Sequence, residues 1–198
     1  MLVLGLTGSA AMGKSTTAAM FAAAGLPVFD ADRTVHRLYR GAAVPVVEAA
    51  FPGTTAGGAV DRDRLREKVL GNEAAMERLE ALIHPLVRAE RDVFLAAAAA
   101  AGHRAVVLDI PLLFETGAEG DMDAVIVVTT APEIQMARML ARDGMTRERA
   151  EAMIARQTPD AEKRRRAHFL VDTSSGLEDA RLQVAGILRA VAGMTGRQ

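Results

Sequence analysis

Residues 8–15 constrain the fold of this chain more than any other segment. They read Gly-Ser-Ala-Ala-Met-Gly-Lys-Ser and match the phosphate-binding pattern of two glycines, a lysine and a hydroxyl residue. The apolar run 2–6 precedes them, and a helix-forming stretch, 14–24, follows. In such a loop the backbone N–H groups and the positive end of the helix dipole converge on a phosphate. The order strand, loop, helix therefore predicts a nucleotide-binding α/β fold, with a glycine turn beside a surface lysine as the alternative.

Short apolar runs alternate with helix-forming stretches over the rest of the chain, which is typical of a parallel sheet with right-handed helical crossovers. Further strands are expected at 28–29, 105–110, 124–129 and 168–172. Further helices are expected at 32–40, at 132–143 and at 177–192. A helical hairpin is expected within 142–167, where Thr146 and Thr158 each mark a helix start. We therefore predict a five-stranded parallel sheet flanked by helices, with residues 1–40 and 105–198 as the nucleotide-binding core.

Residues 41–104 interrupt this alternation and are expected to form a helical insertion between the second and third strands. Prolines and glycines break their first part, and Asp61 and Asn72 are each suited to cap a helix. Apolar residues at three- and four-residue spacing predict a helix over 73–83. His84 and Pro85 are expected to interrupt or kink that helix, which resumes to about residue 101.

The composition excludes several classes of function. The 198 residues contain no cysteine, so thiol nucleophiles, disulfide frameworks and cysteine-ligated zinc are ruled out. There is no tryptophan and only one tyrosine, which argues against a stacking platform for single-stranded nucleic acid. The net charge of −1 argues against a general polyanion binder. No apolar run is long enough to cross a bilayer, and the apolar N-terminus lacks the basic flank of a signal peptide.

Each polar residue of the loop has an expected task in binding ATP. Lys14 is expected to bridge the β- and γ-phosphates, and the Ser15 hydroxyl to ligate Mg²⁺. Asp109 ends the apolar run 105–108 and is expected to hold the metal through water; the alternative is an aspartate that caps a turn. The expected ATP-binding residues are Gly8, Ser9, Ala10, Ala11, Met12, Gly13, Lys14, Ser15 and Thr16.

Asp30 and Asp32 follow the second expected strand, where parallel sheets bind their ligands. A carboxylate there can accept a proton from an acceptor hydroxyl. The spacing leaves open which of the two faces the acceptor, and Asp32 could instead cap the next helix.

Arginine is concentrated in residues 138–166, which hold nine basic and five acidic residues in a chain of net charge −1. Arginine stabilises the charge that develops during phosphoryl transfer. Arg138 and Arg142 lie at i and i+4 and are expected to share a helix face and act in catalysis. Residues 142–167 are expected to form a lid that closes over ATP and excludes water. For the basic run 163–166, a solvated helix face is the alternative.

Taken in order, these motifs resemble the dephospho-CoA kinase family over nearly the whole chain. The landmarks are the phosphate loop, Asp-Ala-Asp at 30–32 with His36, Ile-His-Pro-Leu at 83–86, Asp-Ile-Pro-Leu-Leu-Phe-Glu at 109–115, Arg138 through Arg142 to Gln157, and Phe-Leu-Val-Asp at 169–172. The resemblance implies a fold of the nucleoside-monophosphate-kinase type, in which residues 41–104 bind CoA. It also implies transfer of the ATP γ-phosphoryl group to the ribose 3′-hydroxyl of dephospho-CoA, in the final step of CoA synthesis.

The resemblance further assigns roles on the acceptor side. Asp32 would be the base or would orient the hydroxyl, while Thr7, His84 and Glu115 would line or shape the site; His84 could instead simply hold the helix kink. The implied small molecules are ATP, Mg²⁺ and dephospho-CoA, with neither nucleic acid nor membrane as a partner. A cytoplasmic location and a monomer or weak homo-oligomer are expected.

The phosphate loop departs from the family pattern, which is richer in glycine than Ser9, Ala10 and Ala11. If position 11 has a positive φ, alanine there costs on the order of 1 kcal/mol. We expect activity to be retained with a somewhat altered nucleotide affinity. The alternatives are another small kinase acting on a nucleoside monophosphate or metabolite, a non-catalytic nucleotide-binding regulator, and nucleic-acid binding through the basic lid.

Overall fold

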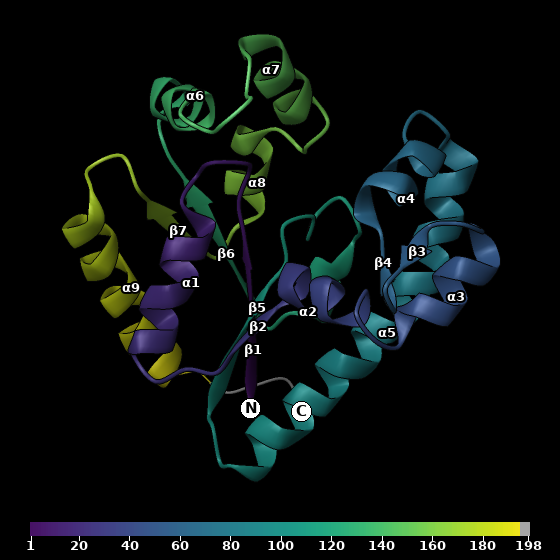
Figure 1. Ribbon diagram of the computed structural model, residues 1–198. Coiled ribbons are helices and arrows are strands. Elements are labelled where there is room, and N and C mark those ends of the chain that lie inside the picture. The colour runs from purple at the N-terminus through teal and green to yellow at the C-terminus, as the bar shows by residue number, and fades with distance from the viewer. Residues whose placement is uncertain (195–198) are drawn as a thin grey trace. The chain divides into compact units, whose positions relative to one another are not determined.

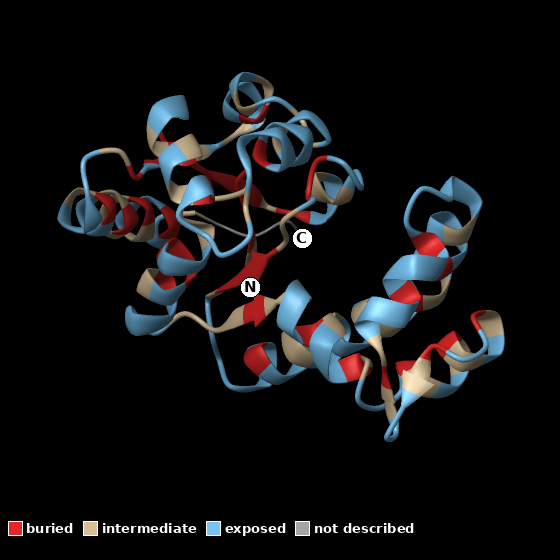
Figure 2. Ribbon diagram, turned by 45° about the horizontal axis from the view of Figure 1, so that its top comes forward, coloured by how far each residue is buried: buried red, intermediate tan, exposed pale blue. Residues whose placement is uncertain are grey.

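The computed structural model describes residues 1–194, so the last four residues of the predicted core lie outside the described part. The chain divides into two compact units, one formed by Met1–Phe29 with Ala98–Gln198 and the other by Asp30–Ala97. Figure 1 shows the elements of each unit, and Figure 2 shows where their buried residues lie.

The first unit is built on the predicted five-stranded parallel sheet, which is confirmed. Across the sheet the strands are β2 (Val28–Asp30), β5 (Ala105–Asp109), β1 (Leu2–Thr7), β6 (Ala124–Thr129) and β7 (Phe169–Asp172). β1 is central and pairs in parallel with β5 and β6. All six residues of β6 are buried, as expected for a strand covered on both faces.

Helices cover both faces of this sheet. On one face α1 (Lys14–Ala23) and α9 (Leu177–Ala192) lie side by side (Figure 1) and pack on the alternate leucines of β1. On the other face α8 (Asp160–Arg166) packs against β6. There Gly5 leaves room for the side chains of Met122 and Leu113, since a Cβ would lie 2.8 Å from the Met122 side chain.

The remaining elements of this unit follow β5 and β6. They are the 3-10 helix η1 (Ala118–Asp121), α6 (Pro132–Leu140) and α7 (Arg147–Ala155). The predicted helical hairpin over 142–167 is present as α7 and α8. Thr146 caps α7 by accepting a hydrogen bond from the Arg149 backbone N–H, as its position predicted.

The second unit has a core of its own. Its elements are α2 (Ala31–Leu38), α3 (Ala43–Ala50), the hairpin of β3 (Thr55–Ala56) and β4 (Ala59–Val60), α4 (Arg62–Val69) and most of α5 (Glu73–Ala100). The unit begins before the predicted boundary at residue 41 because α2 contributes Leu38 to this core, beside Val47 and Leu65. Asp61 and Asn72 both accept backbone hydrogen bonds as helix caps, as predicted.

The breaks expected at Pro45 and Pro85 do not occur, whereas the kink that was the alternative at Pro85 stays a prediction. Pro45 does not break the chain, because it lies in the first turn of α3, where its missing N–H would have had no partner. Pro85 does not interrupt α5, which is continuous over 28 residues. The carbonyl that this proline leaves unpaired belongs to Ala81, and both residues are exposed, so water can bind it.

Candidate active site

The phosphate loop joins β1 to α1, and both of its glycines are required by the backbone. Gly13 has φ 97°, a left-handed conformation that favours glycine, and it caps the N-terminus of α1. Gly8 lies against β6, where an added Cβ would be 2.6 Å from the Val128 carbonyl oxygen. The loop is therefore positioned at the carboxyl end of the central strand, where parallel sheets bind their ligands.

Ala11 has φ 62° and is the only described non-glycine residue with a positive φ. An energetic cost was expected for Ala11 if its φ is positive, and its φ is positive. For an alanine the left-handed conformation costs about 1–2 kcal/mol. The loop therefore keeps its shape against local strain, which requires contacts from outside it.

Lys14 and Asp109 are brought together at the ends of neighbouring strands. Leu6 of β1 is in register with Asp109 of β5, and Lys14 Nζ lies 2.5 Å from Asp109 Oδ1. The two side chains are 15% and 4% exposed, so the pair is largely shielded from water. Because an ammonium group carries three N–H donors, Lys14 can bind Asp109 and still bind phosphate oxygens.

Ser15 and Thr16 lie in the first turn of α1 and are exposed. Met12 is buried in the core below the loop, and its carbonyl oxygen accepts a hydrogen bond from the Thr173 hydroxyl. The described residues contain no cluster of three His, Asp or Glu side chains able to hold a metal. A hydroxyl and a carboxylate fit Mg²⁺, which takes few protein oxygens and keeps water and phosphate ligands.

Arg138 lies in α6 and makes hydrogen bonds to the phosphate loop and to Thr173 beside it. Its guanidinium donates to the Thr173 hydroxyl at 2.8 Å, to the Thr173 carbonyl oxygen at 3.0 Å and to the Ala11 carbonyl oxygen at 3.5 Å. One of the two predicted catalytic arginines thus contacts the loop directly.

The expectation that Arg142 shares a helix face with Arg138 was wrong. α6 ends at Leu140, and the Arg142 backbone N–H bonds to the Met139 carbonyl oxygen three residues back. This tighter turn places Arg142 beyond the helix, where its side chain is exposed and makes no hydrogen bond or ion pair to the described residues.

Glu115 is engaged by α8 and the residues before it. Its Oε1 lies 2.9 Å from Lys163 Nζ and accepts a hydrogen bond of 2.8 Å from the Thr158 backbone N–H. Burial opposes ionisation of Glu115, but these two donors outweigh it and hold the pKa of the carboxyl below its ordinary value. Lys163 is completely buried. The alternative of a solvated helix face for residues 163–166 therefore does not hold for this lysine.

Thr7 is buried at the end of β1, and its hydroxyl donates to the Pro111 carbonyl oxygen at 3.0 Å. This hydrogen bond fixes the segment after β5 against the start of the phosphate loop.

Asp30 and Asp32 belong to the second unit and have different partners. Asp30 Oδ1 accepts a hydrogen bond of 2.9 Å from the Arg33 backbone N–H and caps α2. The capping role considered for Asp32 is therefore wrong. Asp32 is exposed in the first turn of α2, and its carboxylate makes no hydrogen bond or ion pair to the described residues.

His84 is exposed on α5 of the second unit, directly before Pro85. Its ring makes no hydrogen bond to the described residues, so it does not hold the helix through a bond of its own.

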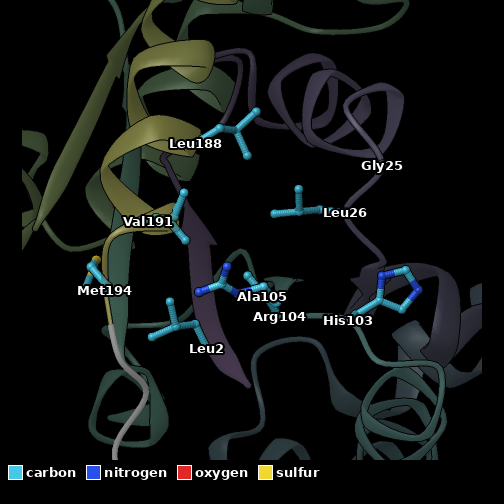
Figure 3. A pocket seen from close by; sticks show the side chains of 10 residues that line it. Leu2, Gly25, Leu26, His103, Arg104, Ala105, Leu188, Val191 and Met194 are labelled. Carbon is cyan, nitrogen blue, oxygen red and sulfur yellow. The ribbon is translucent and has the colours of Figure 1, made fainter.

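A separate pocket lies at the opposite end of the sheet from the phosphate loop (Figure 3). It has a volume of about 220 Å³, and Leu2 and Ala105, the first residues of β1 and β5, line it. Leu188 and Val191 of α9 form another wall, with His103 and Arg104 at its edge. Because nucleotides bind at the carboxyl ends of parallel strands, this pocket is not the nucleotide site.

Two residues that hold the loop, Gln135 and Thr173, were not predicted, and a third, Gln157, was named as a landmark of the resemblance without a role. Gln135 and Gln157 bond to Ala10, and Thr173 bonds to Met12 and Arg138. The sequence offers one weak indication for Gln135: it lies one helical turn before Arg138 and so shares the helix face that contacts the loop. It offers none for Thr173, because its partners are distant in the sequence.

A phosphate loop and a lysine–aspartate pair at the carboxyl end of a five-stranded parallel sheet define the class as a P-loop kinase. Solved structures share this fold. Shikimate kinase from Bacteroides thetaiotaomicron matches with a TM-score of 0.53 at 12% identity, covering 96% of this chain and 98% of that one.

The family follows from closer matches. The dephospho-CoA kinase family model matches residues 2–179. The chain is 60% identical to the dephospho-CoA kinase of Rhodopseudomonas palustris over 100% of both chains. It is 59% identical to that of Mesorhizobium japonicum, over 99% of this chain and 100% of the other. The crystal structure of TT1252 from Thermus thermophilus matches with a TM-score of 0.83 at 32% identity, over 98% of both chains. This chain belongs to the dephospho-CoA kinase family.

Proposed function

We propose that this protein transfers the γ-phosphoryl group of ATP to the ribose 3′-hydroxyl of dephospho-CoA, giving CoA and ADP. The observation that carries the proposal is the pairing of Lys14 with Asp109 beside an intact phosphate loop, in a chain of this family. In the reaction the bond between the γ-phosphorus and the β,γ-bridging oxygen breaks. A bond from that phosphorus to the 3′-oxygen forms, and the hydroxyl proton leaves to a base.

The loop residues bind the ATP phosphates. The loop N–H groups that are not bonded within the protein and those of the first turn of α1 bind the phosphates, and Lys14 bridges the β- and γ-phosphates. The N–H groups of Ala10 and Met12 are not among them, because they donate to Gln157 and Ser9. Ser15, and Asp109 through water, are the residues that would hold Mg²⁺. When bound, Mg²⁺ neutralises charge on the phosphate oxygens. Arg138 and Arg142 stabilise the charge that develops on the transferred group.

Asp32 is the base that accepts the proton of the 3′-hydroxyl. Its unpartnered carboxylate supports this role, whereas the carboxylate of Asp30 is committed to capping α2. Thr7, His84 and Glu115 line or shape the acceptor side. Thr7 and Glu115 do so through the contacts they make, the first with Pro111 and the second with Lys163 and Thr158.

The acceptor is tested by incubating the protein with ATP, Mg²⁺ and a panel of acceptors, with products identified by mass spectrometry. The panel contains dephospho-CoA, AMP, CMP and shikimate. We expect dephospho-CoA to gain one phosphoryl group and the other three to remain unchanged. Phosphorylation of AMP or CMP with dephospho-CoA untouched would contradict the proposal.

We place the reaction in the cytoplasm, with small molecules as the partners and a monomer or weak homo-oligomer as the working form. None of the helices in the described part of the chain combines the length and apolarity that crossing a bilayer requires.

A further inference from the structure

The peptide group on each side of Ala10, in the middle of the phosphate loop, is held by glutamine. The Ala10 N–H donates to Gln157 Oε1 at 3.0 Å, and the Ala10 carbonyl oxygen accepts from Gln135 Nε2 at 2.8 Å. The next residue, Ala11, carries the positive φ of the loop. These hydrogen bonds come from outside the loop and hold the segment that is conformationally strained.

The two glutamines differ in their surroundings. Gln135 lies within α6 and is 5% exposed, so its carboxamide is enclosed by protein. Gln157 follows α7 and is only partly buried. Its own backbone N–H bonds to the Ile154 carbonyl oxygen, and the backbone N–H of Thr158 bonds to Glu115. Gln157 is therefore fixed through its backbone, and the residue is partly exposed, whereas Gln135 is buried.

The orientation of the Gln157 carboxamide follows from the chemistry of its partner. A backbone N–H can only donate, so the atom that faces Ala10 must be the carboxamide oxygen. The Nε2 group then carries two N–H donors, and neither bonds to any described residue. These donors belong to a carboxamide that is anchored to the loop whose N–H groups bind phosphate.

We propose that Gln157 is a phosphate-binding residue that also positions the loop. Its Oε1 holds the Ala10 peptide, and its Nε2 donates to a phosphate oxygen of bound ATP. This inference rests on the proposed function for its substrate, ATP, and adds a residue from the α7–α8 connection to the nucleotide site. A purely structural role would use only the oxygen.

Two substitutions at this position separate the two roles. Gln157→Glu keeps an oxygen for the Ala10 N–H but replaces both donors with a negative charge. Gln157→Met removes the oxygen and the donors together at similar length. Gln135→Met is the matched control, because it loosens the other peptide group of Ala10 and removes a carboxamide that is enclosed by protein.

Affinities are measured by calorimetry with ADP and with the β,γ-imido analogue of ATP, and loop integrity by the melting temperature. For Gln157→Glu we expect a melting temperature close to that of the unmodified protein and an affinity for the analogue at least ~10-fold weaker, since hydrogen bonds to charged groups are strong. The KM for ATP should rise while the KM for dephospho-CoA stays unchanged. For Gln135→Met we expect a lower melting temperature and a much smaller loss of affinity.

The proposal is overturned if Gln157→Glu binds the analogue as the unmodified protein does, while Gln157→Met and Gln135→Met are equally impaired. That result would mean that only the loop-holding oxygen matters. Binding is measured without an acceptor, so the outcome does not depend on the acceptor. If the unmodified protein fails to phosphorylate dephospho-CoA, the proposed function fails while the binding data still decide the role of Gln157.

Discussion

At the residue scale, function depends on which polar groups are left uncommitted by the fold. Asp30 and Asp32 are two positions apart, yet the cap of α2 occupies the first and leaves the second without a partner among residues 1–194. Lys14 is bound to Asp109 but has further donors. A carboxylate or ammonium group with remaining hydrogen-bonding capacity can meet a substrate without first breaking a bond within the protein.

Replacing Asp32 with Asn should lower kcat by ~10²-fold or more, because the amide cannot take up the hydroxyl proton. The affinity for ADP should not change. Asp30→Asn is the matched control, since asparagine caps a helix as well as aspartate does and should leave kcat nearly unchanged. Steady-state kinetics with dephospho-CoA and ATP distinguishes the two variants. Equal kcat values for Asp32→Asn and the unmodified protein would remove Asp32 from the role of base.

Replacing Ala11 with Gly should stabilise the protein by about 1 kcal/mol, because the left-handed conformation no longer carries the Cβ penalty. Part of the gain is offset by the greater freedom of glycine in the unfolded chain. Ala10→Gly is the control, because Ala10 does not have a positive φ and glycine there brings only the entropic loss. Urea denaturation measures both changes. A lower midpoint for Ala11→Gly than for the unmodified protein would contradict the strain assigned to Ala11.

At the scale of elements, α8 is attached to the first unit by buried polar contacts as well as by packing. Lys163 pairs with Glu115, and Asp160 accepts a hydrogen bond of 2.8 Å from the Thr129 hydroxyl of β6. Arg166 pairs with Glu119 and stacks over the Phe114 ring, 4.4 Å from its centroid. The last helix of the predicted lid is thus fixed in place within its unit.

Replacing Glu115 with Gln should destabilise the protein by about 3 kcal/mol at neutral pH, because it leaves the fully buried Lys163 ammonium without its counter-charge. Arg165→Gln, which changes an exposed charge on the same helix, should have little effect. Urea denaturation measures both.

The pH dependence of Glu115→Gln gives a second test with a defined sign. The pKa of Glu115 is lower in the folded protein than its ordinary value. Its ionisation therefore contributes stability above the unfolded pKa of about 4.3, and this contribution is lost as the pH falls through the folded pKa. The difference in stability between the unmodified protein and Glu115→Gln should shrink below about pH 4. A difference that stays constant down to pH 3 would contradict the pairing.

Features that depend on a few neighbouring residues could be predicted from the sequence. The phosphate loop, the five strands and the caps at Asp61, Asn72 and Thr146 depend on short-range patterns, and each was predicted. Lys163 was not separable from its basic neighbours, because its burial depends on Glu115, which lies far away in the sequence. Which of Asp30 and Asp32 is free depends on the residue at which α2 begins, because the first of them caps the helix. Sequence patterns place helix ends only to within one or two residues.

At the scale of the whole molecule, the chain consists of two compact units that each have a hydrophobic core. The sheet with α1 and α9 forms the core of the first, and Leu38, Val47 and Leu65 belong to that of the second. The phosphate loop, Lys14, Asp109 and Arg138 all lie in the first unit, whereas Asp32 and His84 lie in the second. The groups assigned to ATP thus lie in one unit, and two of the four groups assigned to the acceptor, Asp32 and His84, lie in the other. Each unit is stabilised by its own packing.

This division predicts a separable response to the two substrates in amide hydrogen exchange. Ligands slow exchange where they suppress local opening, and the open states of separately packed units differ in free energy. ADP alone should slow exchange in residues 8–16 and in the connection around Gln157, leaving most of Asp30–Ala97 unaffected. Dephospho-CoA alone should slow exchange within Asp30–Ala97. Lys14→Met is the control, and it should lose the response to ADP while keeping the response to dephospho-CoA. Protection by dephospho-CoA confined to the first unit would contradict the assignment of the acceptor to the second.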